Sequence, residues 1–194
     1  MLILASQSET RAALLRATGI PFEPRPARID EAAIKAAART DGATAADTAL
    51  HLATFKAARI REPDALILAA DQLLTCNDTW FDKPATTAEA RAHLAFLRNR
   101  THTLETAIVL HQNGREIWRH LARPRLTMRP FSDAFLDAYL ALEGDVLLTT
   151  VGAYRLEGPG LQLFSRIEGD HTAILGLPML PLLAILRDHR LLLA

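Results

Sequence analysis

Two continuous apolar runs predict buried strands in the first half of the chain. Residues 2–5 and 65–70 carry no polar side chain, and this pattern is typical of strands covered on both faces of a sheet. Asp71 follows the second run directly, so we expect this acid at the C-terminal end of that strand. A third, short apolar strand is expected over residues 171–175.

Helix-forming segments alternate with these strands. Ser8 precedes the first of them and suits an N-cap, because its hydroxyl can accept a hydrogen bond from a first-turn amide. Pro178 suits the start of the last helix, where a proline loses no helical hydrogen bond. We expect helices over residues 12–17, 32–39, 45–60, 87–97 and 132–142, and a last one that begins at Pro178.

The middle of the chain predicts an antiparallel hairpin. Residues 102–111 and 117–128 form two long strand-like segments around Asn113-Gly114, a pair that favours tight hairpin turns. Residues 147–154 predict another strand before a glycine-rich loop. The early alternation and the later antiparallel part together indicate an α/β fold with a mixed, twisted sheet flanked by helices.

Composition narrows the classes of function. The 194 residues include 22 Lys plus Arg and 22 Asp plus Glu, so the formal net charge is zero. This balance argues against nucleic acid or an anionic membrane surface as a partner. The most apolar stretch is shorter than the roughly 20 residues of a membrane span, which indicates a cytoplasmic protein. Apolar helix positions suit a homodimer or the core equally well.

Polar residues after the first strand form a candidate anion site. Ser6 and Ser8 lead into a helix that carries Arg11. Two hydroxyls, the free amides of a helix N-terminus and a guanidinium are together suited to phosphate. An ordinary capped helix with a solvent-facing arginine explains the same residues.

Acids and lysines further along the chain are the next candidates. Asp30 and Glu31 stand at a helix start, where acids commonly serve only as caps. Lys56 interrupts an apolar row, so its ammonium either reaches the surface or points into a polar cleft. Asp71 can bind Mg²⁺ or orient water beyond its strand, or simply end that strand. Lys83 precedes a proline that stiffens the backbone.

Glycines surround one more acid, Glu157. The glycines of residues 152–160 would let the backbone approach a ligand closely, and Glu157 can accept hydrogen bonds from a nucleotide base. The chain has no Ser-His-Asp, HExxH or Walker A pattern. Its mixture of acidic and basic candidates suits a metal-bound polyphosphate.

The same segments, in the same order, resemble the Maf family of nucleotide pyrophosphatases over the whole chain. Residues 4–11 (LASQSETR) are similar to the family's opening LASxSPRR. The other matching elements are Asp30-Glu31, Leu52-Ala53 with Lys56-Ala57, Asp71, Lys83-Pro84, the strand 102–106, the segment 152–160, Gly169-Asp170 and Gly176-Leu177-Pro178. The resemblance implies a single domain over residues 1–194, with two lobes and a central nucleotide-binding cleft.

The resemblance also implies a reaction and a site. A non-canonical or surplus nucleoside triphosphate would be hydrolysed to a nucleoside monophosphate and pyrophosphate. Asp71 would be the catalytic residue that activates or orients water, and Glu31 and Asp71 would hold a divalent metal ion, Mg²⁺ or Mn²⁺. The residues that would bind the substrate phosphates are Ser6, Ser8, Arg11, Lys56 and Lys83.

Three positions bear on substrate specificity in this resemblance. Thr10 stands where the family has a second arginine, at a position linked to specificity. Gln72 and Glu157 resemble the branch of the family that prefers 7-methyl-GTP. A glutamate also suits the donor-rich edge of guanine, so the sequence favours a purine nucleotide.

Two other functions stay open. A nucleotide-binding regulator of cell division that has lost catalysis would fit the missing arginine at Thr10, whereas the presence of Asp71, Lys56 and Lys83 favours an enzyme. A house-cleaning enzyme of the inosine-triphosphate type would cleave the same bond with a different set of motifs.

Overall fold

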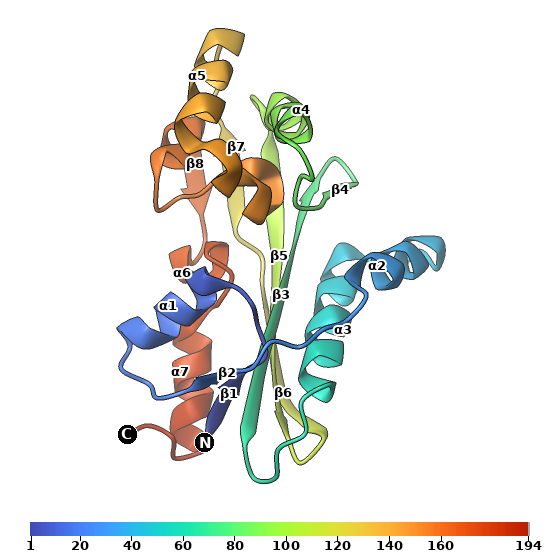
Figure 1. The fold of residues 1–194 in the computed structure, drawn as a ribbon, viewed down its shortest axis with the longest axis vertical. Helices are drawn as coiled ribbons and strands as arrows, with labels where there is room; N and C mark the ends of the chain where they lie inside the picture. Colours follow the sequence, from blue (N-terminus) through green and yellow to red (C-terminus); the bar gives the residue numbers. More distant parts are fainter. Residues whose placement is uncertain (194) are drawn as a thin grey trace. The chain divides into compact units, whose positions relative to one another are not determined.

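The computed structural model describes residues 1–193, which form two compact units (Figure 1). Unit 1 contains Met1–Gln72, Glu105–Ala122 and the residues from Asp170 on, and unit 2 contains Leu73–Leu104 and Arg123–Gly169. Two such units agree with the two lobes that the resemblance implies. Ala194, the last residue of the predicted domain, lies outside the described residues.

The described strands form one mixed sheet, as the sequence predicts. Its order is β2-β1-β3-β5-β7-β8, with β4 paired to β3 and β6 paired to β5. The pairs β1–β2 and β1–β3 are parallel, and β3–β4, β5–β6, β5–β7 and β7–β8 are antiparallel. The strands are β1 (Leu2–Leu4), β2 (Glu23–Pro24), β3 (Leu66–Cys76), β4 (Thr79–Phe81), β5 (Thr101–Gln112), β6 (Arg115–Ala122), β7 (Arg125–Met128) and β8 (Phe164–Glu168).

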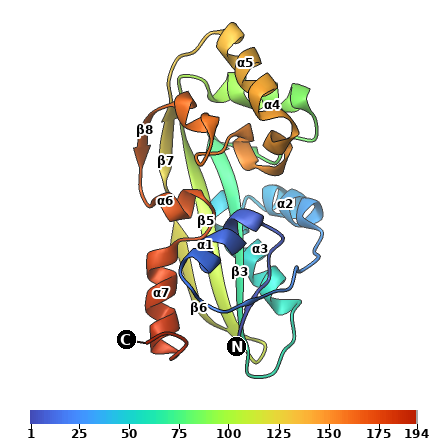
Figure 2. The same ribbon diagram turned by 60° about the vertical axis from the view of Figure 1, so that its left-hand side comes forward.

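Helices cover both faces of the strands of unit 1 (Figures 1 and 2). On one face lie α1 (Glu9–Ala17), α6 (His171–Ile174) and α7 (Met179–Asp188), and on the other lie α2 (Glu31–Thr40) and α3 (Ala45–Ala58). Side chains alternate along a strand, and the even-numbered β3 and β5 residues pack with α1 and α7 in one apolar core: Leu66, Leu68, Ala70, Ile108 and Leu110.

The opposite face of unit 1 is covered mainly by α3. Thr44 caps this helix, since its hydroxyl accepts a hydrogen bond from the amide of Asp47 at 3.1 Å. Thr48, Leu52 and Lys56 form a buried row along it. By contrast, α2 contains no buried residue, so it is attached at the surface of the unit.

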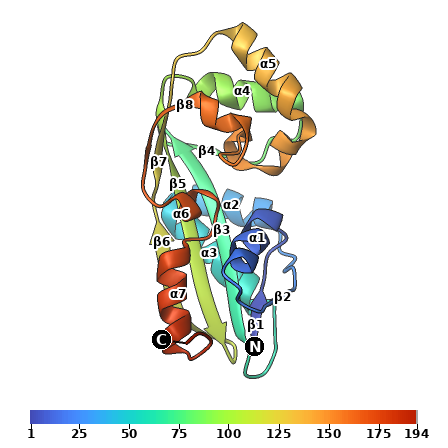
Figure 3. The same ribbon diagram turned by 90° about the vertical axis from the view of Figure 1, so that its left-hand side faces the viewer.

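Unit 2 contains two helices that pack together, α4 (Thr87–Leu97) and α5 (Asp133–Glu143) (Figure 3). The prediction of a strand over residues 147–154 is wrong. This part of the chain forms the short 3₁₀ helices η1 (Gly144–Thr149) and η2 (Val151–Ala153), followed by η3 (Pro159–Leu163). Gly152 and Ala153 have φ values of +75° and +58°, and this left-handed backbone is incompatible with a strand.

Three other predicted boundaries need correction. Strand β3 does not end before Asp71 but runs through it to Cys76. The segment predicted as a strand over 171–175 is helix α6, capped by Asp170, whose Oδ1 accepts from the amide of Thr172 at 2.8 Å. The second hairpin strand is divided into β6 and β7 on either side of Pro124, because proline cannot donate to the ladder. Among residues 1–193, no helix has the length and apolarity needed to cross a membrane.

The surroundings of Gly152 lead to a prediction about stability. A Cβ at this position would lie 2.5 Å from Leu74 Cδ1, in addition to the strain of φ +75°. We expect Gly152→Ala to lower the free energy of unfolding by about 3 kcal/mol, or the melting temperature by about 6–12 °C. Gly42 is the matched control, because its φ is +69° and no atom lies within 4 Å of its added Cβ. Equal losses in thermal melts of Gly152→Ala and Gly42→Ala would contradict the steric argument.

Candidate active site

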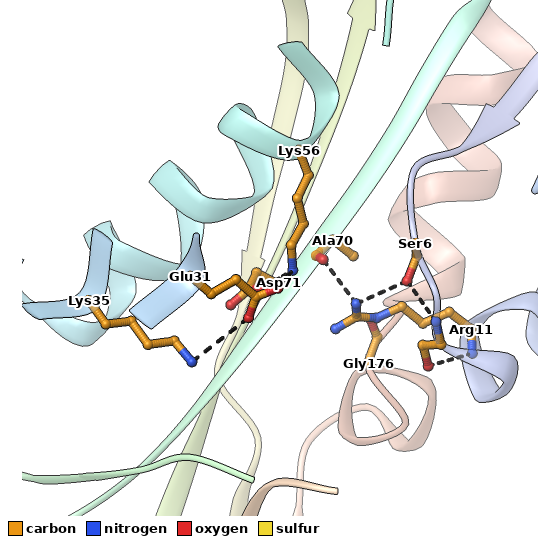
Figure 4. Close-up of polar contacts among 9 residues, drawn as sticks. Ser6, Arg11, Glu31, Lys35, Lys56, Ala70, Asp71 and Gly176 are labelled. Atoms are coloured by element: carbon orange, nitrogen blue, oxygen red, sulfur yellow. Dashed lines mark hydrogen bonds and ion pairs between the residues drawn. The ribbon is translucent and has the colours of Figure 1, made fainter. Parts of the chain in front are cut away.

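A buried lysine joins two carboxylates in unit 1 (Figure 4). Lys56 Nζ lies 2.8 Å from Glu31 Oε1 and donates a hydrogen bond to Asp71 Oδ1. Lys56 is 8% exposed and Asp71 is 4% exposed. The ammonium therefore does not reach the surface, so the first of the two alternatives for Lys56 is wrong.

The elements of unit 1 explain why these three side chains meet. Lys56 belongs to the row of α3 that faces the sheet. Asp71 is an odd-numbered residue of β3 and therefore points away from the core of α1 and α7, toward α3. Glu31 is the first residue of α2, while the neighbouring Asp30 caps that helix by accepting from the amide of Ala33 at 3.0 Å. The two adjacent acids thus have different roles.

The environment of Asp71 raises the pKa of its carboxyl group above the ordinary value. Burial raises the pKa of Asp71, the ammonium of Lys56 lowers it, and the nearby carboxylate of Glu31 raises it again. Burial is the largest of these effects, because it penalises the charged form. An acid with a raised pKa and a neighbouring cation is a common feature of active sites.

Arg11 is held in a fixed position next to this cluster (Figure 4). Its Nε donates to the carbonyl oxygen of Gly176 at 2.9 Å, and its Nη1 donates to the carbonyl oxygen of Ala70 at 2.9 Å and to Ser6 Oγ at 3.4 Å. Ser8 Oγ caps α1 by accepting from the amide of Arg11 at 3.3 Å. Arg11 is therefore not a solvent-facing arginine on an ordinary capped helix.

The guanidinium of Arg11 is electrostatically coupled to the acids. Burial lowers the pKa of Arg11, whereas Asp71 and Glu31 raise it, and an arginine remains charged in either case. Ser6, Ser8 and Arg11 thus come together at the N-terminus of α1, where the helix dipole favours an anion. The structure brings this candidate anion site and the acid–lysine cluster together on β3, since Ala70, whose carbonyl accepts from Arg11, immediately precedes Asp71.

The donor set fits a divalent metal ion that also binds substrate phosphates. Glu31 and Asp71 direct carboxylate oxygens toward the same ammonium, and oxygen is the donor that Mg²⁺ and Mn²⁺ prefer. Among residues 1–193, no group of three or more His, Cys, Asp or Glu side chains could hold a metal ion. Protein binding through two carboxylates, with phosphate and water oxygens as the other ligands, is typical of Mg²⁺ sites.

The other predicted site residues are Thr10, Gln72, Lys83 and Glu157. Thr10 is half-buried on α1, and Gln72 is half-buried on β3, next to Asp71 and on the opposite face of the strand. Lys83 and Glu157 are both exposed and belong to unit 2. The structure assembles Ser6, Ser8, Arg11, Glu31, Lys56 and Asp71 within unit 1.

The glycine-rich loop that carries Glu157 is fixed by contacts within unit 2. Arg155 donates from Nε and Nη2 to the buried carboxylate of Glu143, at 2.9 and 3.4 Å. His102 Nε2 and Tyr154 Oη are 2.8 Å apart in a hydrogen bond. Burial lowers the pKa of His102 to about 3, so this imidazole is neutral and structural.

Sequence reasoning missed the acceptors that hold Arg11. They are the main-chain carbonyls of Ala70 and Gly176, and no side-chain pattern reveals a carbonyl's direction. Gly176 was noticed only as part of a matching motif. Its φ of +97° and the 3.0 Å between an added Cβ and Arg11 Nε show why glycine is needed there.

Comparisons with known proteins show the family of the chain. A family model described as Maf-like protein matches residues 1–189. Proteins named nucleoside triphosphate pyrophosphatase are similar to the chain: one from Rhodospirillum rubrum is 50% identical over 99% of this chain and 96% of its own, and one from Granulibacter bethesdensis is 51% identical over 97% of both. A protein of Rhizobium meliloti named 7-methyl-GTP pyrophosphatase is 48% identical over 97% of this chain and 96% of its own.

The buried ion pair predicts a stability loss that depends on pH. Lys56→Met leaves the Asp71 carboxylate buried without its cation, so we expect it to cost about 3–5 kcal/mol at about pH 8. Without the ammonium the pKa of Asp71 rises further, so Asp71 binds a proton more tightly in the folded state than in the unfolded one. The stability gained by this protonation is present at low pH and is lost as the pH rises through the folded-state pKa.

Urea unfolding at about pH 5 and pH 8 tests this expectation. Relative to the native sequence, Lys56→Met should lose less stability at the lower pH. The double variant Lys56→Met with Asp71→Asn should be more stable than Lys56→Met alone, because no charge is then left unpaired. The same loss at both pH values, with no recovery in the double variant, would contradict an ionised pair.

Proposed function

The chain belongs to the Maf family, and on this premise we propose that it is a nucleoside triphosphate pyrophosphatase. Water attacks the α-phosphorus, the α–β phosphoanhydride bond breaks, and a nucleoside monophosphate and pyrophosphate leave. The observation that carries this proposal is the buried Lys56–Asp71 pair, with Glu31 on the same ammonium, beside the fixed guanidinium of Arg11. A regulator that only binds nucleotide needs no buried base of this kind.

Asp71 is the proposed catalytic residue. Its carboxylate accepts a proton from, or orients, the attacking water, and its raised pKa makes proton transfer more favourable than for an ordinary aspartate. Lys56 supports this role in two ways. It keeps the carboxylate ionised in a buried position, and its ammonium can then interact with phosphate oxygens when substrate binds.

The cations and the helix N-terminus hold the phosphates in this proposal. Arg11 reaches the site with its direction fixed by two main-chain carbonyls, so little ordering is needed when phosphate binds. Ser6 and Ser8 lie at the same N-terminus, and Lys83 is assigned to the same task from unit 2. Positive charge at the β- and γ-phosphates stabilises pyrophosphate as the leaving group.

A divalent metal ion, Mg²⁺ or Mn²⁺, is the proposed cofactor. Glu31 and Asp71 would hold it, and it would neutralise charge that develops on the phosphate oxygens.

We also propose that the two units act as one domain, because β3 and β5 each run through both of them. The cytoplasm is the proposed location of the protein.

Thr10, Gln72 and Glu157 are the proposed specificity residues, and a purine such as 7-methyl-GTP is the proposed substrate. Glu157 is exposed on a loop that Glu143 and Arg155 hold in place, so its carboxylate can meet a base without rearrangement of the loop. A carboxylate accepts hydrogen bonds from the N1–H and exocyclic amine of guanine. The relative from Rhizobium meliloti that is named 7-methyl-GTP pyrophosphatase supports this choice.

The catalytic assignment is tested by Asp71→Asn. The amide cannot act as the base, so we expect pyrophosphate release to fall at least about a hundredfold, while circular dichroism and the melting curve stay those of a folded protein. Asp30→Asn is the matched control, because asparagine caps a helix as well as aspartate does. Turnover of Asp71→Asn close to that of Asp30→Asn would remove Asp71 from the mechanism.

The choice of base is tested by pyrophosphate release across a panel of nucleotides with Mg²⁺ or Mn²⁺. We expect 7-methyl-GTP to be turned over faster than GTP, ITP, dTTP, UTP and CTP, and Glu157→Gln to reduce this preference, since an amide both donates and accepts. Turnover of pyrimidines alone would keep the activity but refute the role of Glu157. Binding without turnover of any nucleotide would favour the regulatory alternative.

A further inference from the structure

We propose that Gln72 and Thr106 position the phosphate-binding arginine from the face of β3 opposite Asp71. They hold α6 and the turn that follows it, and the Gly176 carbonyl of this turn fixes Arg11. The inference rests on the proposed function, because it takes Arg11 as a ligand of substrate phosphate. It gives Gln72 a task that does not involve the base.

The side-chain amide of Gln72 is engaged within unit 1. Its Nε2 donates to Thr106 Oγ1 at 2.7 Å and to the carbonyl oxygens of Ala173 and Ile174, each at 3.1 Å. Main-chain carbonyls only accept hydrogen bonds, so the nitrogen of the amide, not its oxygen, must face α6. The last carbonyls of a helix lack the full set of intrahelical donors, and Gln72 donates to two of them here; that of Ala173 also accepts from the amide of Gly176.

Thr106 completes the contact from β5. Its hydroxyl accepts from Gln72 and donates to the carbonyl oxygen of Ala173 at 3.0 Å. Thr106 is 0% exposed, so it cannot contact a substrate in this structure. Any effect of this hydroxyl on substrate binding must therefore pass through the residues that it touches.

A short chain of contacts leads from α6 to the arginine. The amide of Gly176 donates to the carbonyl oxygen of Ala173 at 3.0 Å, and the carbonyl of Gly176 accepts from Arg11 Nε at 2.9 Å. The turn is tight, because a Cβ at Gly176 would approach Arg11 Nε to 3.0 Å. A displacement of α6 therefore moves the acceptor that sets the direction of the guanidinium.

Burial makes this arrangement sensitive to single groups. Removing the Thr106 hydroxyl takes away the hydrogen bond between β5 and the Ala173 carbonyl of α6 and the bond from Gln72 to β5, so α6 is tied to the sheet through Gln72 alone. With these hydrogen bonds lost, we expect α6, which is a helix of only four residues, to shift. We therefore expect the loss to appear as weaker phosphate binding by Arg11.

Inorganic tripolyphosphate is the probe that separates this role from recognition of a base. It carries phosphate groups and no base, and its binding can be measured by calorimetry without turnover. We expect Thr106→Val to raise its dissociation constant about tenfold, which corresponds to about 1.4 kcal/mol. Thr106→Ser keeps the hydroxyl and should restore binding. In an Arg11→Ala background, Thr106→Val should change the dissociation constant less than about twofold, because coupled residues are not additive.

Thr48→Val is the matched control for loss of a buried hydroxyl. Thr48 is also 0% exposed, and its hydroxyl donates to the carbonyl oxygen of Thr44 at 2.8 Å. The Thr48→Val variant should therefore bind tripolyphosphate as the native sequence does. Circular dichroism verifies that each variant is folded. If Thr106→Val does not fold, Gln72→Leu removes the same contacts from a half-buried position.

Three results would overturn the inference. They are native-like tripolyphosphate binding by folded Thr106→Val, a full tenfold effect that persists in the Arg11→Ala background, and a native protein that does not bind tripolyphosphate. Failure of the proposed function looks different. In that case the native protein binds tripolyphosphate and shows the coupling between Thr106 and Arg11, but releases no pyrophosphate from any nucleotide.

Discussion

The alternation of groups along one buried strand is the constraint on which the site depends. At three consecutive positions of β3, the carbonyl of Ala70 holds Arg11, the carboxylate of Asp71 meets Lys56, and the amide of Gln72 meets α6. A shift of register by one residue would turn Asp71 toward the apolar core of α1 and α7. The pairing of β3 with β1, Leu66 with Leu2 through Leu68 with Leu4, therefore sets the geometry of the chemistry as well as the stability of the fold.

The cluster around Asp71 is better explained by function than by stability. Burying the carboxylate of Asp71 and the ammonium of Lys56 costs desolvation free energy that their attraction recovers only in part, and apolar residues of similar size often serve a fold as well. Leu52 occupies the equivalent position one turn earlier on α3 and is fully buried. A leucine at residue 56 would fit the pattern of that helix, so the charge is retained for what it does to Asp71 and to an incoming phosphate.

Much of this could be predicted from the sequence, and the failures have physical causes. Hydrophobic periodicity predicts β1, α3, α4 and α5 well, because each has a buried face and a recognisable cap or turn. It ends β3 too early, because the pattern of apolar residues stops at Asp71, while Lys56, fifteen residues away in sequence, compensates the buried charge. Pairing over such distances is invisible to a local pattern.

Other features of the structure are not revealed by the local pattern of apolar and polar residues. The strand predicted over 147–154 ignores the left-handed backbone at Gly152 and Ala153, which an apolar run does not reveal. Helix α6 is too short for periodicity and is held by its cap and by Gln72 and Thr106 from distant strands. For Lys83 and Glu157 the sequence shows only the residue types, a cation before a proline and an acid among glycines; the resemblance adds their roles, which stay predictions.

The contrast between α2 and α3 has a consequence for how the site can change its charge. Helix α3 presents Lys56 from a buried row, whereas α2 buries no residue and brings Glu31 to the cluster from the surface. Local opening of a helix costs little free energy when few apolar contacts are lost. Glu31 thus adds a negative charge from the surface to a lysine–aspartate pair that is neutral without it, so the net charge that an approaching polyanion meets depends on a helix with no buried side chain.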